Sequence, residues 1–251
     1  MCVAAVAWDA HPDWLLIVAG NRDEYHARPA AALSRWPDGT IAGKDLTGGG
    51  TWLGVNEQGR FALVTNYRVP EGPQPGRPSR GKLVTDLLGG IAPARLIEPM
   101  AAMNPFNLIL ADQREAWFLT NHPDVELRRL QLGIHGLSNG GFDVPWPKTL
   151  QVEHAIEDWL ARGDPDCAAL LEALRDDTPT PAPERPGLGP EPRFAPVFVR
   201  DAIYGTRCST VIRIDRRGSG SIVERSFDYT GAEIGVVHLN FDWPTSSADI
   251  K

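Results

Sequence analysis

The sequence predicts an α+β fold of four layers, an αββα sandwich in which two β-sheets lie between outer helices. Its 251 residues are enough for one well-buried core, and 42% of them are hydrophobic and 23% charged, which is a globular composition. Strand signals occupy the first part of the chain, helix signals the middle and strand signals the end. No internal repeat or domain boundary is visible, so we expect one domain over residues 1–251.

The first predicted element is a β-hairpin over residues 2–20. The runs Cys2–Trp8 and Trp14–Gly20 are continuously apolar, and a turn containing His11 and Pro12 separates them. Continuous rather than alternating apolar residues indicate strands that are buried on both faces. The following segment, Asn21–Arg35, is polar and is predicted to leave the sheet.

A second hairpin is predicted where Gly48–Asn56 and Arg60–Asn66 flank a Glu-Gln-Gly turn. Residues 69–80 are rich in Pro and Gly and predict a loop, and Ser79 is expected to cap a helix that runs to about Gly89. The remaining predicted strands are Phe106–Ala111, Ala116–Thr120, Glu126–Leu130, Gly133–Leu137, Tyr204–Asp215, Gly220–Phe227 and Ile234–Leu239, and the remaining helices are Trp146–Arg162 and Asp166–Arg175. Residues 176–196 are rich in proline and are predicted to form a long surface loop or a mobile lid.

Composition and charge exclude several classes of protein. The net charge of −7 argues against a nucleic-acid binder, because that affinity comes largely from Lys and Arg. No apolar run approaches the ~20 residues that span a bilayer, and the N-terminus lacks the basic region of a signal peptide. The three cysteines (Cys2, Cys167 and Cys208) show no zinc-type spacing. We therefore expect a cytoplasmic protein with free thiols, no metal site and no required cofactor.

A cysteine directly after the initiator Met offers a specific chemistry. Small second residues normally permit removal of Met1, which would leave Cys2 with a free α-amine beside its own thiol. The α-amine titrates near pH ~7.7–8.0, so it can take the thiol proton at neutral pH. The alternative interpretation is that Cys2 is only a small apolar residue of a buried strand.

Charged residues are expected to lie close to Cys2. A hairpin brings the end of its second strand beside the start of its first, and Gly20-Asn21-Arg22-Asp23-Glu24 follows the second strand. Arg22 could lower the pKa of the Cys2 thiol, and Asp23 could orient the α-ammonium group. The alternative is a solvated loop with local salt bridges.

Several motifs together resemble the NRDE family, the family of the transport and Golgi organisation 2 protein. They run in the family's order from residue 1 to about residue 240 and are Met1-Cys2, Ala19–Glu24, Gly49–Gly54, Val64–Arg68, Leu137–Asn139 and Tyr204–Arg207. The resemblance implies the αββα fold of N-terminal nucleophile hydrolases. It also invites comparison with choloylglycine hydrolases, which are similar in starting with Met-Cys and cleaving amide bonds.

The resemblance implies roles for individual residues. By that likeness Cys2 is the nucleophile, and the other catalytic residues are Arg22, Asp23, Asn66, Asn139 and Arg207. The residues expected to line the ligand site are Asn21, Glu24, Trp52 and Tyr67. The choloylglycine pattern separates its Arg and Asp by two residues, whereas Arg22 and Asp23 are adjacent here. Neighbouring residues in a strand face opposite sides. Unless the chain turns, only one pair faces Cys2, either Asn21 with Asp23 or Arg22 with Glu24. The assignment of Asp23 is favoured over that of Arg22.

Several of these positions have a structural alternative. Asn66 could donate to an oxyanion or simply end a strand in a turn, and Asn139 lies in a Ser-Asn-Gly-Gly stretch typical of turns. Gly48–Gly50 lacks the Lys that a phosphate loop requires, so the glycines are expected to permit a close backbone approach or mobility. Cys208 is expected to face away from its neighbour Arg207.

Two classes of function follow. The first is an amide hydrolase acting on a small amphipathic substrate through Cys2. The second, implied by the resemblance, is an intracellular carrier of haem or of a lipid or acyl-CoA ligand, although none of the six histidines forms a recognisable ligand pair. A purely structural partner protein fits less well with so much polar chemistry near one terminus. The sequence does not determine the oligomeric state.

Overall fold

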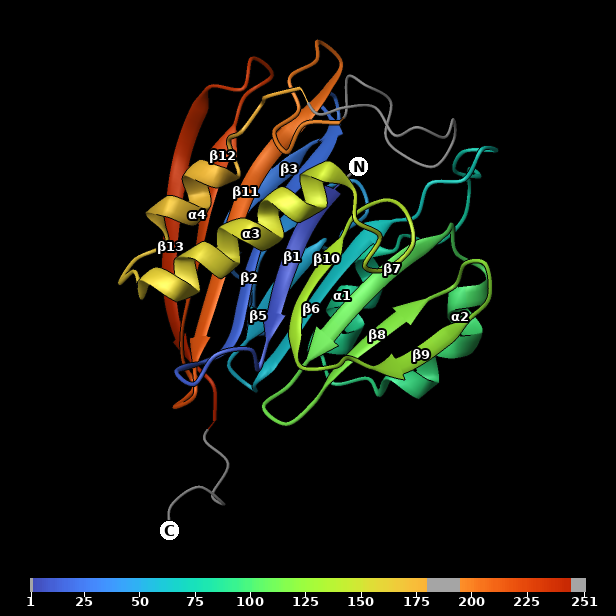
Figure 1. Ribbon diagram of the computed structural model, residues 1–251. Helices are drawn as coiled ribbons and strands as arrows, with labels where there is room; N and C mark the ends of the chain where they lie inside the picture. Colours follow the sequence, from blue (N-terminus) through green and yellow to red (C-terminus); the bar gives the residue numbers. More distant parts are fainter. Residues whose placement is uncertain (1, 180–194, 245–251) are drawn as a thin grey trace.

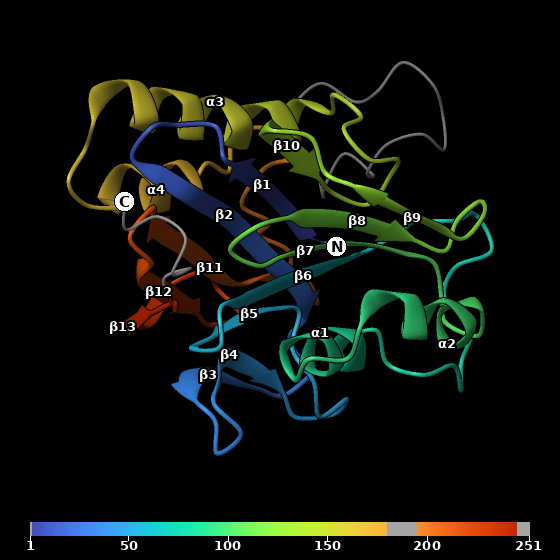
Figure 2. The same ribbon diagram turned by 90° about the horizontal axis from the view of Figure 1, so that it is seen from below.

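The computed structural model describes residues 2–179 and 195–244, which form two packed antiparallel sheets with helices on both outer faces (Figures 1 and 2). The first sheet has the strand order β10 (Gly133–Leu137), β1 (Cys2–Trp8), β2 (Trp14–Tyr25), β11 (Tyr204–Asp215), β12 (Ser219–Phe227) and β13 (Glu233–Asp242). The second has the order β3 (Ala30–Arg35), β4 (Thr40–Asp45), β5 (Leu53–Asn56), β6 (Arg60–Asn66), β7 (Phe106–Ala111), β8 (Ala116–Thr120) and β9 (Glu126–Arg129). Most of the predicted loop or lid at 176–196 lies outside the described residues.

The helices cover the sheets from outside, as Figure 2 shows. Helices α3 (Pro147–Arg162) and α4 (Ala168–Ala173) pack on the first sheet, where Val152, Ile156 and Trp159 of α3 meet alternate residues of β1 and β2. Helix α1 (Gly81–Leu88), the short 3-10 helix η1 (Pro93–Leu96) and α2 (Ile97–Ala101) pack on the second sheet. This arrangement confirms the αββα prediction and agrees with the fold of N-terminal nucleophile hydrolases.

The central core lies between the two sheets. Alternate residues of β1, from Cys2 through Ala4 and Val6 to Trp8, face this layer, and the residues between them face α3. Both faces of β1 are therefore buried, which explains why its sequence is continuously apolar. Burying a side chain such as Val or Leu contributes roughly 1.5–3 kcal/mol.

The strand register places the start of β1 beside the end of β2. Cys2 pairs with Arg22, and the register continues through Ala4 and Gly20. A Cβ atom on Gly20 would lie 2.8 Å from the Cβ atom of Ala4, so this crossing requires glycine. The hairpin therefore brings Cys2 and Arg22 together, as the sequence predicted.

The structure corrects several details of the prediction. Strand β2 continues through Tyr25, so the polar residues after Gly20 stay in the sheet, and β3 also lies within the segment Asn21–Arg35 that was predicted to leave it. Strand β10 does not pair with β9, the strand before it in the chain, but with β1 in the other sheet. Helix α1 lies close to its expected place, but its N-cap residue is Arg80, without a side-chain cap from Ser79.

Candidate active site

The candidate site is a cavity of about 250 Å³ at the end of the sandwich where β1 begins and β2 ends. It brings together six of the predicted site residues, namely Cys2, Arg22, Asp23, Glu24, Trp52 and Asn66. The first four come from the hairpin of the first sheet, whereas Asn66 ends β6 in the second sheet and Trp52 precedes β5. The cavity therefore lies between the two sheets and belongs to both.

The Cys2 side chain lies on the inter-sheet face and is 7% exposed. Burial raises the pKa of the thiol, and the charge of Asp23 adds to this rise. A hydrogen bond from the Asp23 backbone and the positive charge of Arg22 oppose it. Because burial dominates, the thiol is mainly protonated at neutral pH and needs a base before it can attack.

Arg22, and not Asp23, shares the face of Cys2. The alternation of β2 directs Arg22 and Glu24 toward the second sheet, and the Arg22 Nη2 atom lies 3.6 Å from Glu24 Oε2. The Asp23 carboxylate accepts a hydrogen bond of 2.7 Å from the Thr206 hydroxyl of β11. The sequence favoured Asp23 as the residue that faces Cys2, but in the structure the Arg22 side chain does so. Asp23 still lines the cavity, and its backbone hydrogen-bonds to Cys2.

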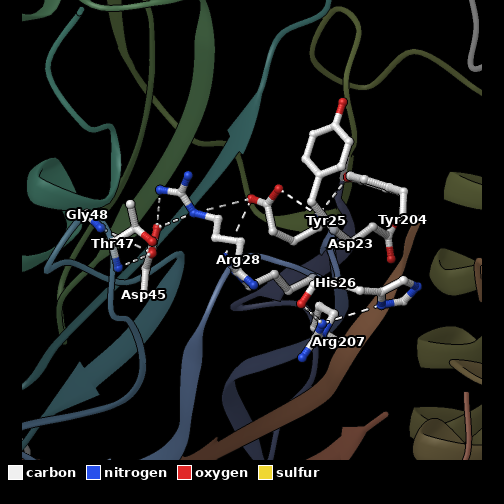
Figure 3. A network of polar contacts seen from close by, with 11 residues as sticks. Asp23, Tyr25, His26, Arg28, Asp45, Thr47, Gly48, Tyr204 and Arg207 are labelled. Carbon is white, nitrogen blue, oxygen red and sulfur yellow. Dashed lines mark hydrogen bonds and ion pairs between the residues drawn. The ribbon is translucent and has the colours of Figure 1, made fainter. Parts of the chain in front are cut away.

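The carboxylates on the inter-sheet side are held by an arginine. Arg28 donates to Asp45 Oδ2 through Nη2 at 2.6 Å and through Nε at 3.0 Å, and its Nε lies 3.8 Å from Glu24 Oε2 (Figure 3). The Asp45 carboxylate also accepts the backbone N–H groups of Thr47 and Gly48. These contacts order the loop beside the cavity and neutralise its acidic groups.

The glycine-rich loop closes against the start of α1. A Cβ atom on Gly50 would lie 2.4 Å from the carbonyl carbon and oxygen of Gly81, and one on Gly81 would lie 2.9 Å from the Thr51 oxygen. No side chain fits at either position. The prediction of a close backbone approach at Gly48–Gly50 is confirmed at Gly50, and it fixes the N-terminus of α1 at the cavity wall.

Asn66 has an uncommitted side-chain amide. It lines the cavity, and its backbone oxygen accepts a hydrogen bond of 2.7 Å from Asn139 Nδ2. Ser138 donates to the Cys2 carbonyl at 2.8 Å, so Ser138 and Asn139 connect the two sheets beside Cys2. No hydrogen bond joins the side-chain amide of Asn66 to the rest of the described chain. Asn66 can therefore donate to a ligand, whereas Asn139 positions Asn66.

A larger cavity of about 600 Å³ adjoins the first one. The two share Glu24, Asn66, Arg80 and Asn104 as lining residues. Its wall includes the predicted residues Tyr67 and Asn139, together with Tyr25, Tyr204 and several prolines. Rings and prolines form part of the wall and charged side chains such as Arg80 and Asp201 form the rest, so the cavity provides room for the body of an amphipathic ligand whose reacting end lies at Cys2.

Arg207 does not line the Cys2 cavity. A β-bulge between Thr206 and Cys208 places two residues of β11 on the same face, so Arg207 and Cys208 line one neighbouring cavity of about 260 Å³. This corrects the expectation that Cys208 faces away from Arg207. The Arg207 guanidinium donates to the backbone oxygen of His26 at 3.0 Å (Figure 3).

Asn21, predicted to bind a ligand, lies on the helix-facing side of β2 and lines neither cavity at Cys2. Its Nδ2 atom donates to the carbonyls of Leu174 and Val197 at 2.8 and 2.9 Å, and its Oδ1 accepts from Ser209 at 2.6 Å. The side chain joins β2 to β11 and to the chain that follows α4. Asn21 therefore stabilises the fold and does not face the Cys2 cavity.

Sequence reasoning missed Lys148, which is 1% exposed at the start of α3. Burial lowers the pKa of the Lys148 ammonium, and the charges of Asp23 and Cys2 oppose this change. The helical spacing of Lys148, Val152, Ile156 and Trp159 puts all four on one buried face. That spacing was the available signal, because a lysine in an apolar stripe requires a buried partner.

The described residues contain no group of three or more His, Cys, Asp or Glu side chains placed to hold a metal ion. Among those same residues, no helix is both long and apolar enough to cross a bilayer.

Comparison with known proteins gives matches over most of the chain. A family model described as transport and Golgi organisation 2 matches residues 1–229. The transport and Golgi organization protein 2 homologs of Bos taurus and Homo sapiens are 34% and 32% identical to the chain, and each alignment covers 90% of this chain and 93% of the relative. A solved structure of the Caenorhabditis elegans N-acylethanolamine-hydrolyzing acid amidase ortholog superposes with a TM-score of 0.50 at 13% identity, covering 84% of this chain and 92% of that one.

Proposed function

We propose that this chain, which belongs to the transport and Golgi organisation 2 family, hydrolyses a carbon–nitrogen (amide) bond of a small amphipathic substrate with Cys2 as nucleophile. The observation that carries the proposal is the position of Cys2. It begins β1, its side chain faces the cavity between the sheets, and Arg22 and the uncommitted amide of Asn66 line the same cavity. Nucleophile, cation and hydrogen-bond donor thus meet at one end of a larger ligand-sized cavity.

Removal of Met1 is the activating step. It gives Cys2 an α-amine that titrates near pH ~7.7–8.0, and this amine takes the proton of the thiol. A base is needed because burial raises the pKa of the thiol. Asp23 orients the resulting ammonium group, since Cys2 pairs with Arg22 and Asp23 is the next residue of the neighbouring strand.

The thiolate sulfur then attacks the amide carbonyl, and a C–S bond forms as the carbonyl electron pair moves to oxygen. Asn66 donates to this oxyanion, an interaction worth ~2.7–4 kcal/mol where comparable donors have been removed. The C–N bond breaks when the oxyanion returns its electrons, and the α-ammonium gives its proton to the leaving nitrogen. Water next hydrolyses the thioester, the amine accepts the water proton, and the Cys2 thiol is restored.

The test combines mass spectrometry with an amide screen. Intact mass shows whether Met1 is absent, and release of amines from a library of N-acyl amides is then compared for wild type, Cys2→Ala and Asn66→Ala. We expect no turnover for Cys2→Ala and a loss of about 10²-fold in kcat for Asn66→Ala. Cys167→Ala is the matched control, because Cys167 is also a buried free thiol but caps the N-terminus of α4 in the core between the helices and the first sheet. Full activity of Cys2→Ala would overturn the proposal.

A second candidate function is carriage of haem or of an acyl ligand without turnover. The observation that favours it is the cavity of about 600 Å³ beside Cys2, with Tyr67 and Tyr204 on its wall. Titration with haem, followed by its Soret band, and with a fluorescent acyl-CoA tests this function. Binding that Cys2→Ala retains, together with no release of amine by wild type, would favour the carrier.

A further inference from the structure

We propose that Arg80 binds an anionic oxygen group of the ligand, a carboxylate or a phosphate, next to Cys2. Arg80 lines both the Cys2 cavity and the larger one, so it stands where the two cavities meet. Binding of an anion by Arg80 does not itself require hydrolysis. Only the position of the anion beside the bond that Cys2 attacks rests on the proposed function. The favoured substrates are then amides that carry an acidic group close to the amide, rather than neutral ones.

The first argument is the charge balance around Arg80. Its guanidinium donates one hydrogen bond, to the Pro105 backbone oxygen at 3.1 Å, and no carboxylate of the described residues forms an ion pair with it. The nearby acidic groups already have arginine partners, since Glu24 lies close to Arg22 and Arg28, and Arg28 also binds Asp45. A half-buried guanidinium is left with free donors, and oxygen anions match its planar geometry.

The second argument is independent and concerns Arg22. Arg22 is 8% exposed, and its Nη1 atom is buried without any hydrogen-bond partner. Arg22 lines the same cavity as Arg80. A buried donor without a partner is unfavourable, so an unpartnered guanidinium atom on an arginine that lines a cavity favours a ligand that supplies the acceptor.

The third argument is the start of α1. This helix of eight residues has Arg80 as its N-cap, no side-chain cap and no acidic residue in its first turn. Ser79, Arg80 and Gly81 line the Cys2 cavity, so the positive end of the helix dipole lies at its wall. The close packing of Gly50 on Gly81 holds this helix end in place.

The test uses two alkylating reagents that differ in charge. Iodoacetate is an anion and iodoacetamide is its neutral isostere, and each forms an S–C bond with the Cys2 thiolate as iodide leaves. Peptide mass spectrometry gives the rate at Cys2 apart from the other two cysteines. We expect the ratio of the iodoacetate rate to the iodoacetamide rate to be higher in the folded protein than in the urea-unfolded chain, and to fall about fivefold in Arg80→Gln.

Matched variants identify the cause of a change. Arg60→Gln removes the same charge at the other end of α1, where Arg60 donates to the Leu88 carbonyl at 3.2 Å, and is expected to keep the wild-type ratio. Arg80→Lys retains the positive charge and is expected to keep most of the wild-type rate ratio. An unchanged ratio in Arg80→Gln, or an equal fall in Arg60→Gln, would contradict the proposal.

Competition on the wild-type protein adds a measurement that does not depend on a variant folding. Acetate and inorganic phosphate should each slow alkylation by iodoacetate, and the more effective anion identifies the preferred group as a carboxylate or a phosphate. Absence of protection by both would overturn the anion site. Protection without hydrolysis of any amide would leave the anion site standing and reject the hydrolase, and hydrolysis without protection would do the reverse.

Discussion

The two faces of β2 near its end carry buried polar residues in opposite states. Toward the helices, the Asn21 amide is fully bonded, to the carbonyls of Leu174 and Val197 and to the Ser209 hydroxyl. Toward the other sheet, Arg22 is almost as buried, yet its Nη1 atom has no partner. On one face the strand end connects neighbouring elements through satisfied hydrogen bonds, whereas the other face keeps an unsatisfied donor, as the proposed binding site requires.

The largest expected effect is on stability and concerns the hydrogen bonds of Asn21. Asn21→Ala removes three buried hydrogen bonds and leaves their partners without replacements, so we expect a loss of about 3 kcal/mol in the free energy of unfolding. Urea denaturation measures it. Asn240→Ala, at an exposed position of the edge strand β13, is the control and should stay within about 0.5 kcal/mol of wild type. A loss below 1 kcal/mol in Asn21→Ala would remove the basis of the comparison.

A smaller effect on stability is expected for Arg22, on the inter-sheet face of β2. Arg22→Met replaces a buried, incompletely bonded cation with an apolar side chain of similar length, and we expect the free energy of unfolding to change by at most about 1 kcal/mol. The same urea measurement decides it. If Arg22→Met destabilises the protein as much as Asn21→Ala, the two faces do not differ in how far their buried polar groups are satisfied.

The sequence predicted this strand end only in part. Apolar continuity and turn residues were enough to place the hairpin, and its geometry brought Arg22 to Cys2. The orientation of Arg22 and Asp23 could not be derived, because it depends on whether β2 continues past Gly20. That continuation is decided by pairing with β11, about 180 residues later, where Tyr204 also donates to the Asp23 backbone oxygen.

The smallest predicted effect concerns a second buried group on the inter-sheet side. Burial raises the pKa of the Glu224 carboxyl, although the Leu33 N–H group donates to it and lowers the pKa. The folded pKa therefore lies above the unfolded value, so stability is lost as the pH rises through the folded pKa. Glu224→Gln cannot ionise and should be similar to wild type at pH 4 but more stable at pH 8, by about 1 kcal/mol or less. Parallel urea titrations at the two pH values measure the difference, and a variant less stable at pH 8 would contradict the assignment.

Other parts of the site depended on local irregularities that residue patterns do not encode. The bulge in β11 moves Arg207 to a neighbouring cavity, and no sequence motif around Thr206 predicts this bulge. Lys148 could have been found from its helical spacing with Ile156 and Trp159. Arg80 could not be predicted, because only tertiary packing determines that the loop after β6 returns to the Cys2 cavity.

The strand order of the first sheet has a consequence for the timing of biosynthesis. The hairpin of β1 and β2 leaves the ribosome first, but β10 and β11, which flank it, follow much later, with Ser138 lying 136 residues after Cys2 and Ser209 lying 188 residues after Asn21. At ordinary synthesis rates the second separation corresponds to about 10–40 s. During that interval the two edges of the hairpin that β10 and β11 later cover have not yet been paired. The topology thus delays closure of the sheet around Cys2 until most of the chain has been synthesised.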